Sequence, residues 1–386
     1  MPHDNTVFHA LLKHVPWDRL DEAVARHGAA GCVRGFSFKS QLTAMLFAQL
    51  SGASSLRHVA DGLQSHADRL YHLGVEPARR ATLADANRDR PAAVFTDLLG
   101  CMMACARRGL RRAVREATHL IDSTSLRLTD LSAGWARFSA RACGAKLHLV
   151  YDPAADRPTY AAVTPARVND ITAAQRIPIE PGATYVFDLG YYDYAWWARP
   201  NAAGCRIVTR LKATTELSAG QTKPVEPGPI LSDRTGHLPR RQASSRRNPM
   251  SGEVREITLR IQTGKVLRIL TNDLEASAQE IADLYKRRWQ IELLFRWVKQ
   301  NLKITRFLGT SENAIRIQIA TALIAFLLLR VAQQTQAAIT APLAFARLVR
   351  DNLMHRRPLT RLARPPEKPN PNPGQGSLFP MGKHYA

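Results

Sequence analysis

Apolar residues in the first third of the chain recur every three or four positions, which is the spacing of one helix face. The pattern is clearest near the start, at Val7, Phe8, Leu11, Leu12 and Val15. Ser40 and either Ser54 or Ser55 precede later apolar runs and are candidate N-caps, because a serine hydroxyl can satisfy free N–H groups at a helix start. Residues 1–115 are therefore predicted to form an all-α N-terminal domain.

From about residue 116 the pattern changes to short runs rich in β-branched and aromatic residues, which predict strands. These runs cover residues 118–124, 145–152, 159–164, 184–190 and 205–211. Helical spacing separates the later runs, so the mixture indicates an α/β fold with a sheet layer. Two more strand-like runs, 255–261 and 265–273, follow a stretch rich in Gly, Pro, Ser and Thr, so residues 212–270 are predicted to be a β-rich insertion.

Helical periodicity returns at 277 and continues to 335, which closes a predicted catalytic domain over residues 116–335. The longest apolar run, Ile317–Leu329, covers 13 positions, whereas a bilayer-spanning helix needs about 20, so we expect a buried helix. No secretory signal is visible, and we expect a cytoplasmic protein without membrane association. Residues 336–386 are predicted to form a C-terminal helix and a disordered tail rich in Pro, Gly and Asn.

The charge balance changes the picture from an ordinary metabolic protein to one that binds a polyanion. The 386 residues include 54 Lys and Arg against 32 Asp and Glu, a formal net charge of +22. Such an excess favours nucleic acid or an anionic membrane surface, since neutralising phosphates releases counterions. Five scattered cysteines without C-x2-C pairs argue against a disulfide framework and against a structural zinc site.

Two aspartates stand where predicted strands end, Asp122 after THLI and Asp188 after TYVF. Carboxylates at such positions lie at the rim of an α/β sheet, where ligands bind. The alternative for each is an ordinary turn or helix cap. Asp193 is a rival to Asp188, but it lies in the aromatic segment YYDYAWW, which is typical of a turn into a helix. Trp196 and Trp197 in that segment are predicted core residues, with base stacking by one of them as the alternative.

The segment from 277 to 303 is predicted to be one helix with a cationic stripe. At about 100° per residue, four polar side chains fall within an arc of about 60°: Tyr285, Arg288, Glu292 and Lys299. We expect them on one open side, opposite the apolar residues Ile291, Leu294, Trp297 and Val298. From 286 to 306 there are seven basic residues and one acid, Glu292. A lone carboxylate among cations indicates a metal ligand beside phosphate contacts, whereas the ordinary alternative is a solvated amphipathic helix.

The spacing Tyr285-x2-Arg288-x3-Glu292-x6-Lys299 resembles the Tyr-Arg-Glu-Lys signature of the DDE transposases of bacterial insertion sequences, in the family named after insertion sequence four. The segments IDST around Asp122 and FDLGYYDYAWW after Tyr185 resemble the first and second aspartate blocks of that family. The resemblance covers roughly residues 30–335. It departs at Leu189, where the family often has arginine.

The resemblance implies a ribonuclease-H-like catalytic core. By the same match, Asp122, Asp188 and Glu292 correspond to the catalytic and metal-binding triad, and two Mg²⁺ or Mn²⁺ ions are the implied cofactors. Tyr285, Arg288 and Lys299 correspond to residues that contact DNA phosphates near the cleavage point. Carboxylates suit these hard cations, and two ions would assist phosphodiester cleavage.

The function implied is cut-and-paste DNA transposition. The expected partners are double-stranded DNA, both terminal inverted repeats and target DNA, and a second copy of the chain when two ends are synapsed. We expect a bacterial protein that associates with the nucleoid when it is bound to DNA. Two alternatives remain open, namely a non-catalytic DNA-binding protein derived from a transposase and a ribonuclease-H-like nuclease.

Overall fold

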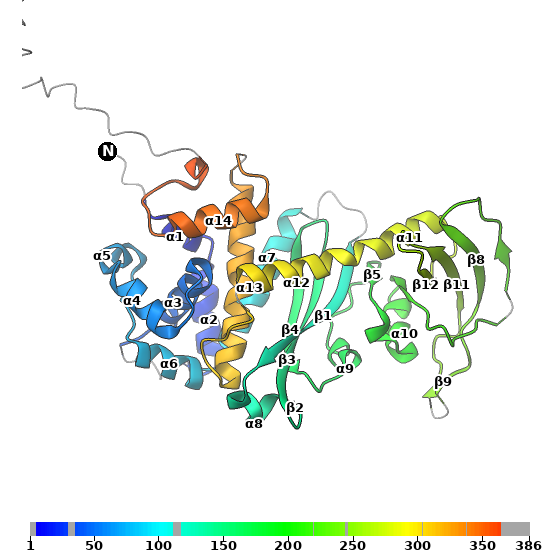
Figure 1. The fold of residues 1–386 in the computed structure, drawn as a ribbon, viewed down its shortest axis with the longest axis horizontal. Coiled ribbons are helices and arrows are strands. Elements are labelled where there is room, and N and C mark those ends of the chain that lie inside the picture. Colours follow the sequence, from blue (N-terminus) through cyan, green and yellow to red (C-terminus); the bar gives the residue numbers. More distant parts are fainter. Residues whose placement is uncertain are drawn as a thin grey trace, which may run out of the picture.

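The computed structural model describes residues 5–29, 35–110, 117–218, 220–243, 246–302, 304–336 and 338–363 (Figure 1). A helical region and a sheet-rich region lie side by side along the longest axis of the molecule. The predicted disordered tail, from residue 364 onward, lies outside the described residues.

The N-terminal region is helical, as the periodicity predicts. Its helices are α1 (Val7–Leu12), α2 (Trp17–Arg26), α3 (Phe38–Ser51), α4 (Leu56–Gln64), α5 (Ala67–Leu70), α6 (Arg80–Asp89) and α7 (Ala93–Leu110). Ser55 caps α4 by accepting a hydrogen bond from the backbone N–H of His58, which confirms one candidate cap. Ser40 is wrong as a cap, because α3 begins earlier and Ser37 accepts the hydrogen bond from Ser40 N–H.

One mixed sheet runs through the rest of the chain, and its central strands are those that the sequence predicts. The first strands are β1 (Thr118–Leu128), β2 (Arg137–Ser139), β3 (Ala142–Asp152), β4 (Arg157–Pro165), β5 (Thr184–Val186) and β6 (Arg206–Arg210). β3 lies antiparallel to β1, and β2 and β4 both pair antiparallel with β3. On the other side of β1, β5 and β6 follow in parallel.

The strands of the predicted β-rich insertion extend this same sheet. They are β7 (Thr222–Lys223), β8 (Ile230–His237), β11 (Glu253–Arg260) and β12 (Val266–Thr271), with the separate pair β9 (Arg241–Ala243) and β10 (Arg246–Arg247). β12 pairs antiparallel with β6, and β11, β8 and β7 follow outward in that order. The insertion therefore continues from the edge at which the parallel strands end.

Two sets of helices cover the two faces of the sheet, because alternate strand residues point to opposite sides. Leu120 and Leu149 belong to the larger core, which includes apolar residues of α7, α12 (Trp289–Asn301) and α13 (Glu312–Gln334). Ile121 and Val150 belong to a second core, with residues of α9 (Asp170–Ala174) and α10 (Tyr194–Ala202). Short α8 (Ala133–Ala136) precedes β2.

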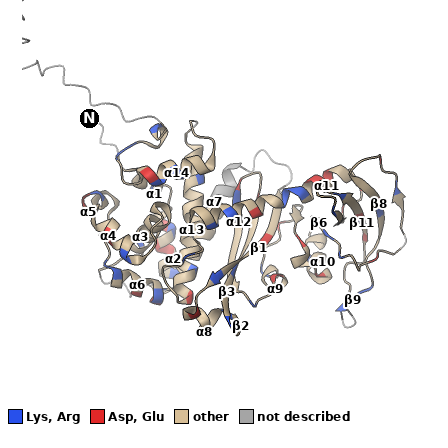
Figure 2. Ribbon diagram, viewed as in Figure 1, with Lys and Arg blue, Asp and Glu red and all other residues tan. Residues whose placement is uncertain are grey.

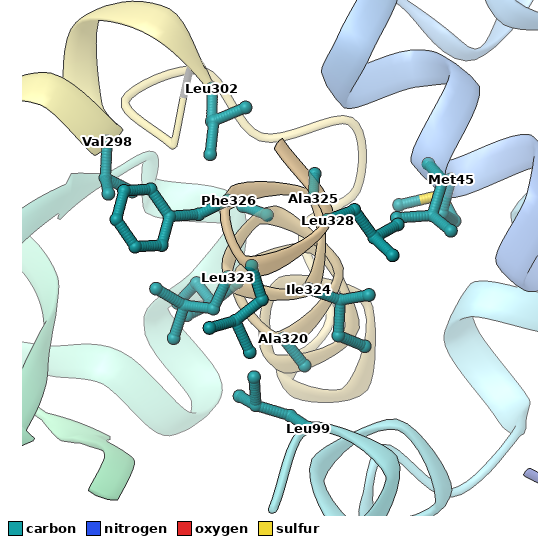
Figure 3. Packing of buried hydrophobic residues seen from close by; sticks show 14 of the residues in the cluster. Met45, Leu99, Val298, Leu302, Ala320, Leu323, Ile324, Ala325, Phe326 and Leu328 are labelled. Carbon is teal, nitrogen blue, oxygen red and sulfur yellow. The ribbon is translucent and has the colours of Figure 1, made fainter. Parts of the chain in front are cut away.

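Helix α13 contains the long apolar run, and its burial confirms the prediction of a buried helix. By length and composition α13 could cross a membrane, but 83% of its most apolar 18-residue window is buried inside the protein. Figure 3 shows its side chains pointing in several directions, toward Met45 of α3, Leu99 of α7 and Val298 of α12. Helix α14 (Pro342–Asn352) also packs on it. Although predicted within the catalytic domain, α13 thus joins the helical region to the sheet.

We predict that Leu328→Ala, at a fully buried position of α13, lowers the free energy of unfolding by about 3–5 kcal/mol, because it leaves a cavity that the packed helices cannot close. The matched control is Leu131→Ala, since that leucine is 80% exposed and its removal should change stability by less than about 0.5 kcal/mol. Chemical denaturation measures both. Equal effects of the two substitutions would contradict the place of α13 at the centre of the fold.

Candidate active site

Asp122 lies in the middle of β1, opposite Leu149 of β3. The interpretation that it ends a strand is wrong, because β1 continues to Leu128. Asp122 nevertheless lies beyond the part of β1 that is paired with β5, because β5 pairs with β1 only as far as Leu120. The backbone N–H of Ser123 donates to Asp122 Oδ1 at 2.7 Å, which fixes the orientation of this carboxylate.

Asp188 follows β5, the strand beside β1, so the two aspartates meet at the same end of the parallel pair, as the sequence predicts. The chain turns sharply after β5, and Gly190 N–H donates to Asp188 Oδ1 at 2.8 Å. The rival Asp193 has another role. It caps α10 by accepting from Trp196 N–H at 2.8 Å, and its other oxygen pairs with Arg246.

Glu292 comes from a helical segment that passes over β5 and β1 toward α13 (Figure 1). The prediction of one helix over 277–303 is only partly right, because the segment is divided into α11 (Ala278–Arg287) and α12, with Arg288 between them. Ser277 caps the start of α11. Glu292 lies in the first turn of α12, where a carboxylate is favoured by the helix dipole.

Arg288 connects two of the three predicted triad carboxylates, those of Asp122 and Glu292. Its guanidinium donates to Glu292 Oε1 at 2.6 Å and to Asp122 Oδ2 at 3.4 Å. The Arg288 and Asp122 side chains are each only 15% exposed, so water screens this contact weakly. Further along α12, Lys299 Nζ donates to the backbone carbonyl of Ser125 at 3.0 Å. Figure 2 shows basic and acidic residues together along α11, α12 and neighbouring β1.

Asp122 is held in an environment that disfavours its charge. Burial raises the pKa of Asp122 to about 7, and the nearby carboxylates of Asp188 and Glu292 act in the same direction. The N–H of Ser123 and the guanidinium of Arg288 act against this shift. Asp188 and Glu292 therefore lie close enough to Asp122 to act on its charge, although Asp188 follows Asp122 by 66 residues and Glu292 follows Asp188 by 104.

Tyr285 is buried, so the expectation that its ring lies on the open side with the other three residues is wrong. Its hydroxyl still belongs to the site. Burial raises the pKa of Tyr285, the Arg288 and Arg210 guanidiniums lower it, and Asp188 raises it slightly. Leu294 and Val298 are buried as predicted, and Trp297 is half-buried against Phe326, with ring centroids 5.2 Å apart.

Two site residues were missed by the sequence analysis. Arg210 ends β6, and its Nε is buried without a hydrogen-bond partner among the described residues. Asp170 begins α9, and its carboxylate lies beside Asp188: a Cβ on Gly190 would be 3.0 Å from Asp188 Oδ1 and 3.2 Å from Asp170 Oδ2. Neither belongs to a motif: the pairing of β6 with β5 brings Arg210 toward Asp188, and the packing of α9 on the turn after β5 brings Asp170 there.

The aromatic segment after Asp188 is core. Trp196 and Trp197 are both 0% exposed, so the alternative that one of them stacks on a base is wrong. Their indole N–H groups donate to the backbone carbonyls of Ala174 and Tyr191. The segment thus supports the loop that carries Asp188.

The donor atoms of the site suit a hard divalent cation. Asp122, Asp188 and Glu292 offer only carboxylate oxygens, which Mg²⁺ and Mn²⁺ prefer. Burial of Asp122 and the nearby charges of Asp188 and Glu292 disfavour its charged form, and a bound cation would relieve both effects. In the described part of the chain, no group of three or more His, Cys, Asp or Glu side chains is arranged to hold an ion, and here the Arg288 guanidinium contacts both Glu292 and Asp122.

Known proteins resemble this chain in sequence. A family model described as a transposase DDE domain matches residues 116–328, and a model of a domain of unknown function matches residues 3–76. A Sinorhizobium fredii protein named as transposase y4zB is 40% identical over 297 residues, covering 76% of this chain and 82% of the relative.

Two further relatives carry insertion-sequence names. A Geobacillus stearothermophilus protein named as the transposase of insertion sequence element IS5377 is 28% identical over 331 residues, 82% of each chain. A Synechocystis protein named for element IS4SA is 48% identical over 65 residues, covering 17% of this chain and 19% of the relative. Since the family model spans more than half of the chain, this chain belongs to the transposase DDE domain family, the DNA transposases of bacterial insertion sequences.

Proposed function

We propose that this transposase performs cut-and-paste transposition with two Mg²⁺ or Mn²⁺ ions held by Asp122, Asp188 and Glu292. The observation that carries the proposal is the convergence of these residues: two neighbouring parallel strands supply the aspartates, and Arg288 ties Glu292 to Asp122. The metal ions would supply charge stabilisation at the reacting phosphate and lower the pKa of the attacking water or 3′-hydroxyl.

The strand order supports a ribonuclease-H-like core as part of this proposal. Strands β4, β3 and β1 are successive antiparallel neighbours, and β5 and β6 continue in parallel from β1, in the spatial order β4-β3-β1-β5-β6. The β-rich insertion then enters between β6 and α11, and so lies between Asp188 and Glu292 in the sequence.

In this proposal, the cations around the carboxylates bind DNA phosphates. Arg288 is a planar donor that can engage a phosphate with two N–H groups, and Lys299 on the same helix adds a second positive charge. Arg210 and the Tyr285 hydroxyl lie on the side of Asp188. Arg288 pairs with the carboxylates of Asp122 and Glu292, and this limits the electrostatic cost of holding the two together.

The remaining parts of the proposal concern the partners. The helical region and the net charge of +22 support binding of terminal inverted repeats and target DNA, because the excess cations offset phosphate charge. Two copies of the chain would each hold one end in a homodimer on synapsed ends. We place this activity on the nucleoid in the bacterial cytoplasm.

We predict that Asp122→Asn, Asp188→Asn and Glu292→Gln each abolish strand cleavage and change affinity for terminal-repeat DNA by less than about threefold, since they remove metal ligation and leave phosphate contacts in place. A cleavage assay beside a gel-shift titration checks this. Asp193→Asn is the matched control, because Asp193 caps α10 outside the site, and it should retain cleavage. Wild-type cleavage by any of the three variants would remove that residue from the triad.

Arg288→Ala and Lys299→Ala should weaken DNA binding and reduce the slope of log affinity against log salt by about one unit for each lost phosphate contact. Binding titrations at several salt concentrations measure the slope. Arg260→Ala removes an exposed cation at the far end of β11 and should leave the slope unchanged. The same slope in all three variants would show that the α12 cations do not touch phosphate.

Metal binding should depend on pH through Asp122. The pKa of Asp122 is about 7 in the folded protein and 3.8 in the unfolded chain. Protonated Asp122 therefore stabilises the metal-free fold at low pH, and this stabilisation is lost as the pH rises through about 7. A cation needs the carboxylate, so Mn²⁺ affinity should rise by up to about tenfold per pH unit below about pH 7 and level off above it. Calorimetric titration at several pH values tests this, and an affinity that is constant between about pH 5.5 and 7 would contradict it.

A further inference from the structure

Asp170 is the centre of a polar cluster that the metal-binding triad does not include. Its Oδ1 accepts hydrogen bonds from Ser123 Oγ at 2.8 Å and from Lys146 Nζ at 3.1 Å. Lys146 also donates to the carbonyl of Val168, so the ammonium is fixed at two points. His148 Nδ1 lies 3.7 Å from the same carboxylate oxygen, but burial lowers the pKa of His148 to about 4, and the ring is neutral at neutral pH. Lys146 therefore supplies the positive charge that the carboxylate contacts.

This cluster lies on the face of the sheet opposite to Glu292. Ser123 pairs with His148 and Ser125 pairs with Lys146 across β1 and β3, so these side chains share one face. Asp122 is the next residue along β1 and points to the other face, where α12 lies. Asp170 therefore approaches the active site from behind β1.

Ser123 connects Asp170 directly to Asp122. The hydroxyl of Ser123 donates to Asp170 on one face, and the backbone N–H of the same residue donates to Asp122 Oδ1 at 2.7 Å. Any movement of Ser123 would therefore also shift the Asp122 carboxylate.

Asp170 also lies beside the turn that carries the second aspartate. The N–H of Gly190 donates to Asp188 Oδ1, and a Cβ at Gly190 would lie 3.2 Å from Asp170 Oδ2 and 3.0 Å from Asp188 Oδ1. Both carboxylates therefore pack against Gly190, and a side chain at this position would press on both of them.

The hydroxyl of Tyr191 provides an independent indication that a ligand enters here. Tyr191 is 1% exposed, and its Oη has no hydrogen-bond partner of good geometry among the described residues. Burial raises the pKa of Tyr191 well above its usual value, the carboxylates of Asp170, Asp122 and Asp188 raise it further, and the Ser123 hydroxyl beside it lowers it. The Tyr191 hydroxyl therefore remains a donor near Ser123 and these carboxylates, where a water or phosphate oxygen arriving with a cation would complete its hydrogen bonding.

We propose that Asp170 is a positioning residue of the active site, which holds Asp122 through Ser123 and packs beside the Gly190 turn that carries Asp188, in the arrangement that binds the divalent cation. The inference rests on the proposed metal-dependent function. Outer groups that orient metal-binding carboxylates raise metal affinity, and their loss typically costs about 10–100-fold.

The experiment is a calorimetric titration of the full-length protein with Mn²⁺, supported by thermal unfolding and by cleavage of terminal-repeat DNA across Mn²⁺ concentrations. Asp170→Asn should weaken Mn²⁺ binding by about 10–100-fold, and cleavage should recover at high Mn²⁺ while DNA binding stays unchanged. Ser123→Ala, which removes only the hydroxyl that reaches Asp170, should shift Mn²⁺ affinity in the same direction by a smaller factor. Asp97→Asn is the matched control, because Asp97 is a partly buried aspartate that pairs with Arg26 in the helical region.

Wild-type Mn²⁺ affinity in Asp170→Asn would overturn the inference. If Asp170→Asn does not fold, Ser123→Ala becomes the test. An Mn²⁺ affinity unchanged from the wild type in Ser123→Ala would also overturn the inference. Asp122→Asn separates the two proposals. Should Asp122→Asn also bind Mn²⁺ as the wild type does, the proposed metal-dependent function fails; should it lose binding while Asp170→Asn keeps it, only the positioning role of Asp170 fails.

Discussion

The partial burial of Asp122 beside two other carboxylates is the constraint on which the active site depends. Burial raises the pKa of Asp122 to about 7, and the charges of Asp188 and Glu292 act in the same direction, so the fold holds this carboxylate where its charged form is disfavoured. Arg288, which contacts both Asp122 and Glu292, offsets part of that cost. A divalent cation would offset this electrostatic cost more fully, and for this reason the site suits a metal ion.

The architecture produces this crowding by stopping one strand early. Because β5 ends beside Leu120, the middle of β1 is left uncovered, and Asp122, Asp188 and the helical segment that carries Glu292 can meet there. Helix α13 gives the arrangement rigidity, since the helical region, α12 and one face of the sheet all pack into the same core around it (Figure 3). The insertion extends the sheet outward from β6, so it adds surface beside the site without interrupting it.

Local patterns predicted the strands and the buried helix, because alternation and periodicity are properties of short segments, whereas the triad rests on motif spacing and stays a prediction. Local patterns failed where tertiary contacts decide the structure. Asp122 lies inside a longer strand because β3 pairs with β1 as far as Leu128, and Arg288 interrupts the predicted single helix at the point where it contacts Asp122. Arg210 comes near Asp188 because β6 pairs with β5, and Asp170 does so because α9 packs on the turn after β5, and no spacing in the sequence reveals either contact.

The most direct test of the central claim, that Asp122, Asp188 and Glu292 form one metal site, is anomalous X-ray scattering from Mn²⁺ in crystals of the protein bound to terminal-repeat DNA. The account predicts Mn²⁺ bonded to carboxylate oxygens of Asp122 and Asp188, with Glu292 completing the site and Arg288 beside a phosphate. Mn²⁺ bound only elsewhere, with Glu292 still paired to Arg288, would contradict it.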